Sequence, residues 1–229
     1  MARNLGIIPL VMSIEANVHA VRQRISAAAQ RAGRPAEAVT LVAAAKSANV
    51  DAIRAAIEAG VVHFGENRVQ DAQRKIQELG PLRVGTTWHM IGNLQSNKAK
   101  ISVEVFDIIQ SVASVRLGQR LDRFLEEPRT VLLEVNVAQE ATKHGFQPDE
   151  LADAYAALRR CGNLEIRGLM AIAPMTADPQ DVRPVFRRLR EMAQGLGLAE
   201  LSMGMTNDFE VAVEEGATMV RVGRAIFGD

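Results

Sequence analysis

The feature that most constrains the fold is a repeated alternation between short apolar runs and longer segments with one polar face. The apolar runs, which we predict to be strands, lie at 39–45, 61–65, 86–91, 106–110, 130–137, 164–170, 199–202 and 218–222. Helical segments are predicted at 14–32 and near 49–60, 67–79, 96–103, 114–126, 148–160, 179–195 and 207–215. Strands that are apolar on both faces and alternate with helices are typical of a parallel sheet covered by helices.

Eight strand–helix units favour a closed (β/α)8 barrel, the TIM barrel, with an extra N-terminal helix. The alternative is an open doubly wound sheet, which normally has fewer strands in a chain of 229 residues. Because no proline-rich or serine-rich linker interrupts the alternation, we expect one domain over residues 1–229. Residues 1–12 could be an N-terminal extension, since Met12 is a second candidate for the natural start.

Charge and composition argue against several classes of protein. The 27 lysines and arginines balance 27 aspartates and glutamates, so the chain lacks the positive charge typical of nucleic-acid-binding or membrane-surface proteins. No apolar run approaches the roughly 20 residues that a membrane helix needs, and the start lacks the basic lead-in of a signal peptide. The single cysteine, Cys161, cannot form an internal disulfide, which is typical of a reducing compartment. We therefore expect a soluble, cytoplasmic protein.

A lysine at the end of the first predicted strand is the first candidate for chemistry. Lys46 follows the apolar run LVAAA in a chain that holds 22 arginines and only five lysines. A desolvated lysine amine can lose its proton and attack an aldehyde, whereas an arginine guanidinium stays charged. The alternative is a lysine whose stem packs on the strand end while its ammonium group reaches water. Position alone leaves both interpretations open.

Two loops after the seventh and eighth predicted strands have the composition of a phosphate site. LSMGMTNDFE (201–210) supplies hydroxyl and backbone N–H groups ahead of a helix, and RVGRAIFG (221–228) supplies glycine and two arginines. Phosphate sites in such barrels are often built from these two loops. Ordinary helix capping and a glycine turn would explain either loop alone. A reactive lysine and a phosphate loop together describe a site for a phosphorylated aldehyde, either pyridoxal 5′-phosphate (PLP) or the sugar phosphate of an aldolase.

Six segments, in the same order along the chain, resemble one known family. They are FGENRVQDA (64–72), WHMIGNLQSNKAK (88–100), KHGF (143–146), RGLMAIAP (167–174), LSMGMTNDFE (201–210) and MVRVGRAIFG (219–228). These segments resemble the YggS/PROSC-type pyridoxal phosphate homeostasis proteins over nearly the whole chain. The resemblance implies a fold-type III PLP-binding barrel, similar to the N-terminal barrel of alanine racemase.

The resemblance also implies which residues bind PLP. The family's lysine, which forms a covalent aldimine (a Schiff base) with the cofactor, falls on Lys46. The other cofactor-binding positions fall on Asn67 near the ring, Ser202, Gly204, Met205, Thr206, Gly223 and Arg224 around the phosphate, and Arg221 close to the ring nitrogen or the phosphate.

Four positions depart from the family's usual pattern. Ala45 stands where a serine is more common, Arg68 where a tyrosine is, Asn207 where an aspartate is, and Arg224 where a threonine is. None of them removes the aldimine lysine. Arg224 either replaces a hydroxyl contact to the phosphate with a charge or points to solvent.

The resemblance favours a carrier over an enzyme. An alanine-type racemase needs a second base, usually a tyrosine from a separate domain, and we expect no such domain because the sequence ends at Asp229. The only tyrosine, Tyr155, lies on a predicted outer helix. An arginine near the ring nitrogen also disfavours the protonated ring that makes PLP a strong electron sink.

We therefore expect a PLP-binding protein that takes part in intracellular PLP (vitamin B6) homeostasis and supplies PLP-dependent apo-enzymes. The family suggests a monomer or weak dimer. The alternative is a PLP-dependent amino-acid racemase with low activity. 

Other polar residues are given structural interpretations. His63 and His89, on neighbouring predicted strands, are interpreted as packed or hydrogen-bonded barrel histidines, and no metal site is predicted. Glu134 and Arg167, on the fifth and sixth predicted strands, are expected to pair inside the barrel, because a buried charge without a partner is costly.

Overall fold

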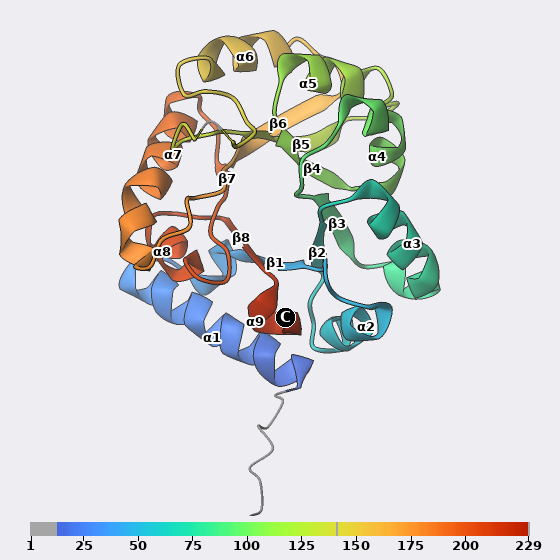
Figure 1. Cartoon of the computed structure of the whole chain (residues 1–229), viewed down its shortest axis with the longest axis vertical. Helices are drawn as coiled ribbons and strands as arrows, with labels where there is room; N and C mark the ends of the chain where they lie inside the picture. Colours follow the sequence, from blue (N-terminus) through green and yellow to red (C-terminus); the bar gives the residue numbers. More distant parts are fainter. Residues whose placement is uncertain (1–12, 141, 229) are drawn as a thin grey trace, which may run out of the picture.

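The computed structural model describes residues 13–140 and 142–228, and it shows a closed barrel of eight parallel strands (Figure 1). The strands are β1 (Thr40–Ala44), β2 (His63–Glu66), β3 (Thr87–Met90), β4 (Ile108–Val112), β5 (Arg129–Glu134), β6 (Leu164–Met170), β7 (Glu200–Ser202) and β8 (Met219–Val222). They follow one another around the barrel in chain order, and β8 pairs with β1 to close it. The predicted TIM barrel is therefore confirmed, and the open doubly wound sheet is not observed.

Helices form an outer ring around the strands (Figure 1). They are α2 (Val50–Glu58), α3 (Val69–Leu79), α4 (Ala99–Val105), α5 (Val115–Asp122), α6 (Leu151–Leu158), α7 (Arg183–Gly195), α8 (Phe209–Glu214) and α9 (Arg224–Phe227). Short 3-10 helices precede or follow some of them: η1 (Ala36–Ala38), η2 (Gly80–Arg83), η3 (Ser96–Lys98) and η4 (Pro179–Val182). In the described part of the chain, no helix is both long enough and apolar enough to cross a membrane.

The predicted elements overlap the observed ones, with ends that differ by a few residues. The fifth strand ends at Glu134, earlier than predicted, and the side chain of Asn136 forms a local turn just beyond its end. Its Nδ2 donates to the carbonyl of Glu140 at 2.8 Å, and its Oδ1 accepts from the Glu140 N–H at 3.1 Å. This local pairing is typical of asparagine in turns, and it begins the loop that carries residues 143–146.

The extra N-terminal helix, α1 (Ile14–Arg31), is also confirmed, and it covers the seam where β8 meets β1 (Figure 1). It begins at Ser13, whose side chain accepts from the Ala16 N–H at 3.2 Å. Its apolar face packs on α2, α8 and α9. Because α9 has only four residues, α1 supplies the helical layer that this part of the barrel would otherwise lack. The possible extension at residues 1–12 lies outside the described residues.

Side chains along β8 point alternately to the outer layer, between the strands and helices, and to the interior of the barrel. Val220 and Val222 are fully buried between the strands and the outer helices, in the main hydrophobic cluster. Met219 and Arg221 are also buried, and Met219 packs inside the barrel in a small cluster with Val42, Leu132 and Met170. Successive side chains of a strand point to opposite faces, so Arg221 also points inward. The barrel interior therefore holds the charged side chain of Arg221 together with a small apolar cluster around Met219.

Gly168 on β6 lies where two strands approach too closely for a side chain. A Cβ atom at this position would lie 1.9 Å from the carbonyl oxygen of Glu200 on β7. We expect Gly168→Ala to lower the free energy of unfolding by about 1–3 kcal/mol, because the strands must separate to accept the methyl group. Urea unfolding followed by circular dichroism measures this change.

Gly162→Ala is the matched control, since no atom lies within 4 Å of a Cβ at Gly162. Equal stabilities of the two variants would show that the β6–β7 contact is looser than described.

Candidate functional site

The predicted site residues gather at the mouth formed by the carboxyl ends of the strands. Lys46 follows β1, Asn67 follows β2, and Gly223 and Arg224 follow β8. The 203–208 loop follows β7, and Arg221 projects inward from β8. These four strands are consecutive around the barrel because β8 pairs with β1. The closed topology thus brings together segments from both ends of the sequence.

Lys46 lies at the rim of this mouth, not on the strand. The β1–β2 ladder continues to Ala45, whose N–H donates to the Gly65 carbonyl at 2.8 Å. The backbone then turns at residues 46–47 toward Asn49, which caps α2 by accepting from the Ala52 N–H at 2.8 Å. As a result, Lys46 is exposed, in agreement with the interpretation in which its ammonium group reaches water and not with a desolvated lysine.

A buried ion pair lies directly behind Lys46 and Asn67. Lys75 Nζ on α3 lies 2.5 Å from Glu66 Oε1 and 2.6 Å from the carbonyl oxygen of Ala45. The other carboxylate oxygen of Glu66 accepts from the Asn67 N–H at 2.8 Å. Lys75 and Glu66 are only 3% and 1% exposed. One ion pair therefore fixes the backbone next to both predicted site residues.

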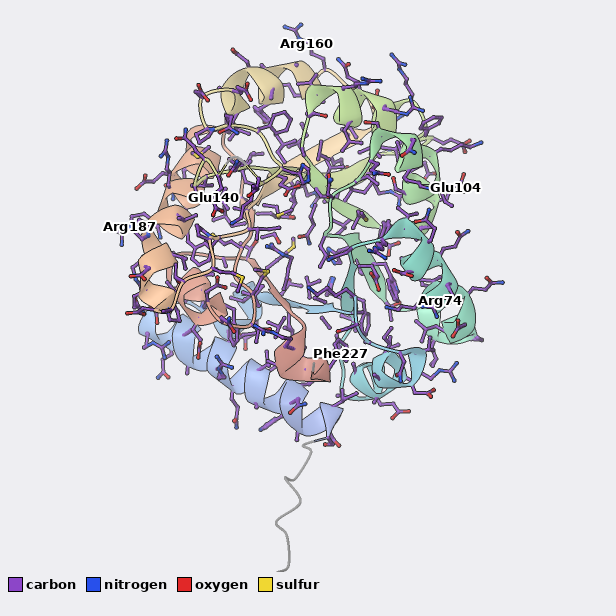
Figure 2. The ribbon with its side chains drawn as sticks, in the orientation of Figure 1. Arg74, Glu104, Glu140, Arg160, Arg187 and Phe227 are labelled. Atoms are coloured by element: carbon purple, nitrogen blue, oxygen red, sulfur yellow. The ribbon has the colours of Figure 1, made fainter. Side chains whose placement is uncertain are left out.

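Sequence reasoning missed this pair, although a signal was present. The buried residues of α3 are Val69, Ala72, Lys75 and Leu79. Their spacing places Lys75 within the apolar stripe of an amphipathic helix, where a charged residue needs a buried partner. Arg74, the preceding residue, points outward on α3, as Figure 2 shows.

Arg221 is a buried cation at the base of the mouth. It is 4% exposed, and it donates to Ser202 Oγ at 2.6 Å and to the Ala171 carbonyl at 2.9 Å. Over residues 13–140 and 142–228, it forms no ion pair with a carboxylate. Burial lowers the pKa of Arg221 to about 10, while Glu134 and Asp208 oppose this effect, so the group stays charged at neutral pH.

Ser202 lies deeper than the sequence suggested. It is fully buried inside the barrel, and its hydroxyl accepts from Arg221 and donates to Gln110 Oε1 at 2.6 Å. The hydroxyl is therefore already engaged below the loop. The groups that face the mouth come from the residues that follow it.

The loop at 203–208 is held in a shape that presents backbone N–H groups. Gly204 has φ +89°, and a Cβ there would lie 2.5 Å from the Cβ of Ala212. Asp208 Oδ1 accepts from the Met205 N–H at 2.6 Å and closes the loop. Among the residues that the structure describes, the N–H groups of Gly204, Thr206 and Asn207 have no acceptor. Such free N–H groups are typical of anion-binding loops.

The loops after β7 and β8 touch each other through two residues that depart from the family's pattern. Arg224 NH2 donates to Asn207 Oδ1 at 3.2 Å. An aspartate and a threonine at these positions would offer an acceptor and a hydroxyl, whereas this chain has an amide and a guanidinium. The two departures thus form one contact, and Arg224 is exposed at the rim.

Glu134 is a buried carboxyl group that sequence reasoning placed in the wrong pair. It is 6% exposed, and in the described part of the chain its Oε2 has no hydrogen-bond partner. Burial raises the pKa of Glu134, and the charges of Arg221 and His144 oppose the rise. Arg167 instead pairs with Glu165 at 2.9 Å, because residues two apart on β6 share its exposed face.

A hollow of about 370 Å³ adjoins Asn67, between the loops that follow β2 and β3. Its lining includes Arg68, Gln70, Gln95 and Lys98. Arg68 therefore adds positive charge beside the mouth, at a position where the resemblance implies a tyrosine. A larger hollow of about 490 Å³ lies between α1 and α2, and none of the predicted site residues lines it.

We expect Lys75→Met to lower the free energy of unfolding by about 3–5 kcal/mol, because it leaves Glu66 buried and unpaired. Urea unfolding measures the change. Arg74→Met is the control, since the Arg74–Glu78 pair is half exposed and its loss should cost under about 1 kcal/mol. The double variant Lys75→Met/Glu66→Gln should recover part of the loss. Equal stabilities of the Lys75 and Arg74 variants would contradict the buried pair.

Comparison with known proteins agrees with this geometry. The family model described as "Alanine racemase, N-terminal domain" matches residues 16–229. The pyridoxal phosphate homeostasis protein of Pseudomonas aeruginosa is 42% identical over 221 residues, covering 94% of this chain and 95% of the relative. The protein of the same name from Escherichia coli K12 is 41% identical over 221 residues, covering 93% and 94%.

Solved structures give the same result. PipY of Synechococcus elongatus with PLP bound matches with a TM-score of 0.82 and 38% identity, covering 94% of this chain and 100% of PipY. An alanine racemase of Clostridium difficile 630 matches with a TM-score of 0.72 at 14% identity, covering 95% of this chain and 56% of the racemase, which supports the fold alone. On the sequence identities and the coverage, this chain belongs to the family of pyridoxal phosphate homeostasis proteins.

Proposed function

We propose that this protein binds PLP at the mouth of the barrel and takes part in intracellular PLP homeostasis. The observation that carries the proposal is Arg221, a buried cation that no carboxylate pairs with in the described residues. A buried charge needs compensation, which a ligand with an anionic group would supply, and a ring nitrogen would accept a hydrogen bond from the guanidinium. The relatives' shared name and the PLP-bound structure of PipY support PLP as that ligand.

The residues of the mouth fit the parts of PLP. The free N–H groups of Gly204 and Thr206, with Gly223 and Arg224 on the adjoining loop, would hold the phosphate, and Met205 would line this part of the site. Arg221 and Asn67 would contact the ring. PLP supplies an aldehyde that reacts with amines, and we propose that Lys46 Nζ holds it covalently. Ser202 would act through Arg221, because its hydroxyl is already engaged.

The same residues favour holding and release over catalysis. Arg221 remains charged at neutral pH, so it can donate a hydrogen bond to the ring but does not readily transfer a proton. Lys46 is exposed at the rim, where an amine of another molecule can reach the bond that it forms. We therefore propose that the protein acts as a monomer or weak dimer and supplies PLP to apo-enzymes. The single cysteine supports a cytoplasmic location.

We expect purified protein, mixed with PLP and then freed of excess, to show a visible absorbance band that Lys46→Ala lacks. The band arises because the covalent link extends the conjugated system of PLP. Lys100→Ala, which changes an exposed lysine on α4, is the control and should keep the band. A band of equal strength in Lys46→Ala would place the covalent link elsewhere, and no band in any of the proteins would reject PLP binding through a lysine.

A second candidate function, amino-acid racemase of low activity, is favoured by Glu134. Racemisation needs a base opposite the lysine, and β5 lies opposite β1 in the barrel. Glu134 ends β5 with one unpartnered oxygen. If this function exists, Glu134→Gln should slow the exchange of the α-proton of alanine with deuterated solvent by about 100-fold or more. Glu165→Gln, on the exposed face of β6, should leave the rate unchanged.

Proton NMR in deuterated water with added PLP measures this rate. Exchange no faster than that of free PLP with alanine would reject the racemase function.

A further inference from the structure

Five polar side chains from five strands form one continuous hydrogen-bonded chain through the centre of the barrel. They are His63 on β2, His89 on β3, Gln110 on β4, Ser202 on β7 and Arg221 on β8. The successive contacts measure 3.0, 2.8, 2.6 and 2.6 Å. All but His63 are at most 4% exposed. Polar groups buried this deeply are costly unless every donor finds an acceptor, so the chain has one favourable arrangement of protons.

The direction of hydrogen-bond donation along these five side chains is fixed by Arg221, because a guanidinium can only donate. Its NH1 donates to Ser202 Oγ, and the Ser202 hydroxyl donates its single hydrogen bond to Gln110 Oε1. The amide nitrogen of Gln110 then donates to His89 Nδ1 at 2.8 Å and to Met219 Sδ at 3.6 Å. Both amide protons and the amide oxygen are thus satisfied, which fixes the orientation of the Gln110 side chain.

The far end of the chain requires two neutral histidines. Because His89 Nδ1 accepts, its proton lies on Nε2, which donates to His63 Nδ1 at 3.0 Å. If both rings were fully protonated, the N–H groups at His89 Nε2 and His63 Nδ1 would both be donors and could not form a hydrogen bond with each other. Burial lowers the pKa of His89 to about 3 and also lowers that of His63, although Asp107 opposes the second effect. Neutral rings therefore match the geometry of the chain.

We propose that Gln110 is a positioning residue that holds the guanidinium of Arg221 in the orientation needed to bind PLP. Gln110 fixes Ser202 Oγ, and Ser202 fixes NH1, while the Ala171 carbonyl fixes NH2. Two such bonds define the plane of the guanidinium. This proposal rests on the proposed function. It gives Gln110, His89 and His63 a role at a site that none of them contacts.

The first test reads the orientation of Arg221 without PLP. In the unliganded protein, ¹⁵N NMR should resolve separate signals for the two terminal nitrogens of Arg221, because its guanidinium cannot rotate. We expect these signals to merge in Gln110→Leu, which removes the support of Ser202. Ser111→Ala is the matched control, because Ser111 is the next residue on β4 and its buried hydroxyl has no partner in the described residues. The control should keep the separate signals.

The same spectra test the direction of hydrogen-bond donation along these five side chains. In the wild type, both histidines should carry their proton on Nε2, which their ring nitrogen shifts report. Merged Arg221 signals in the wild type, or a proton on Nδ1 of His89, would overturn the proposal whether or not the protein binds PLP. The failure of PLP binding alone would instead reject the proposed function.

The second test measures how the loss of Gln110 changes the affinity for PLP and the absorbance of bound PLP. We expect Gln110→Leu to weaken PLP binding about tenfold and to shift the absorbance maximum of bound PLP, with Ser111→Ala unchanged in both. The Ser202→Ala/Gln110→Leu double variant should lose no more affinity than Ser202→Ala alone, because both changes break one chain. Additive losses, or wild-type affinity in Gln110→Leu, would overturn the positioning role.

If Gln110→Leu does not fold, Gln110→Asn replaces it, since its shorter side chain cannot reach both neighbours.

Discussion

The ion pair between Lys75 and Glu66 is the interaction on which the mouth of this barrel depends. It joins α3 to the ends of β1 and β2, at the carbonyl of Ala45 and the N–H of Asn67. Removing two charges from water is expensive, and a buried apolar pair would often be as stable. The ion pair adds directional contacts: besides binding each other, Lys75 donates to the Ala45 carbonyl and Glu66 accepts from the Asn67 N–H, so two backbone groups on different strands are held in fixed positions.

The fold was predictable because the barrel follows from a pattern that repeats along the whole sequence. Each apolar run is long enough for one buried strand, and each amphipathic segment covers one side of the barrel. The candidate site could be predicted only as a set of loops at one end of the barrel. Lys46 was correctly placed after β1, yet its exposure depends on how the chain turns toward Asn49, a local geometry that apolar patterning does not encode.

The buried polar groups were the least predictable part. Ser202 appears in a loop-like sequence, but its side chain points into the barrel because it ends β7 with an inward orientation. Glu134 and Arg167 lie on adjacent strands, and the register shift between β5 and β6 leaves one in the barrel mouth and the other on the exposed face. Which face a residue occupies at a bulge depends on strand register, which a single sequence does not specify.

The closure of the barrel between β8 and β1 links ligand binding to the completeness of the fold. Arg221 pairs with Val42 across this seam, so two segments almost a full chain length apart must meet before Lys46 and Arg221 lie at the same mouth of the barrel. A ligand that contacts both strands binds only the closed form, and by mass action it stabilises that form in proportion to the logarithm of its free concentration. The supply of ligand in the cell would therefore also set how much of the newly made protein is folded and protected from degradation.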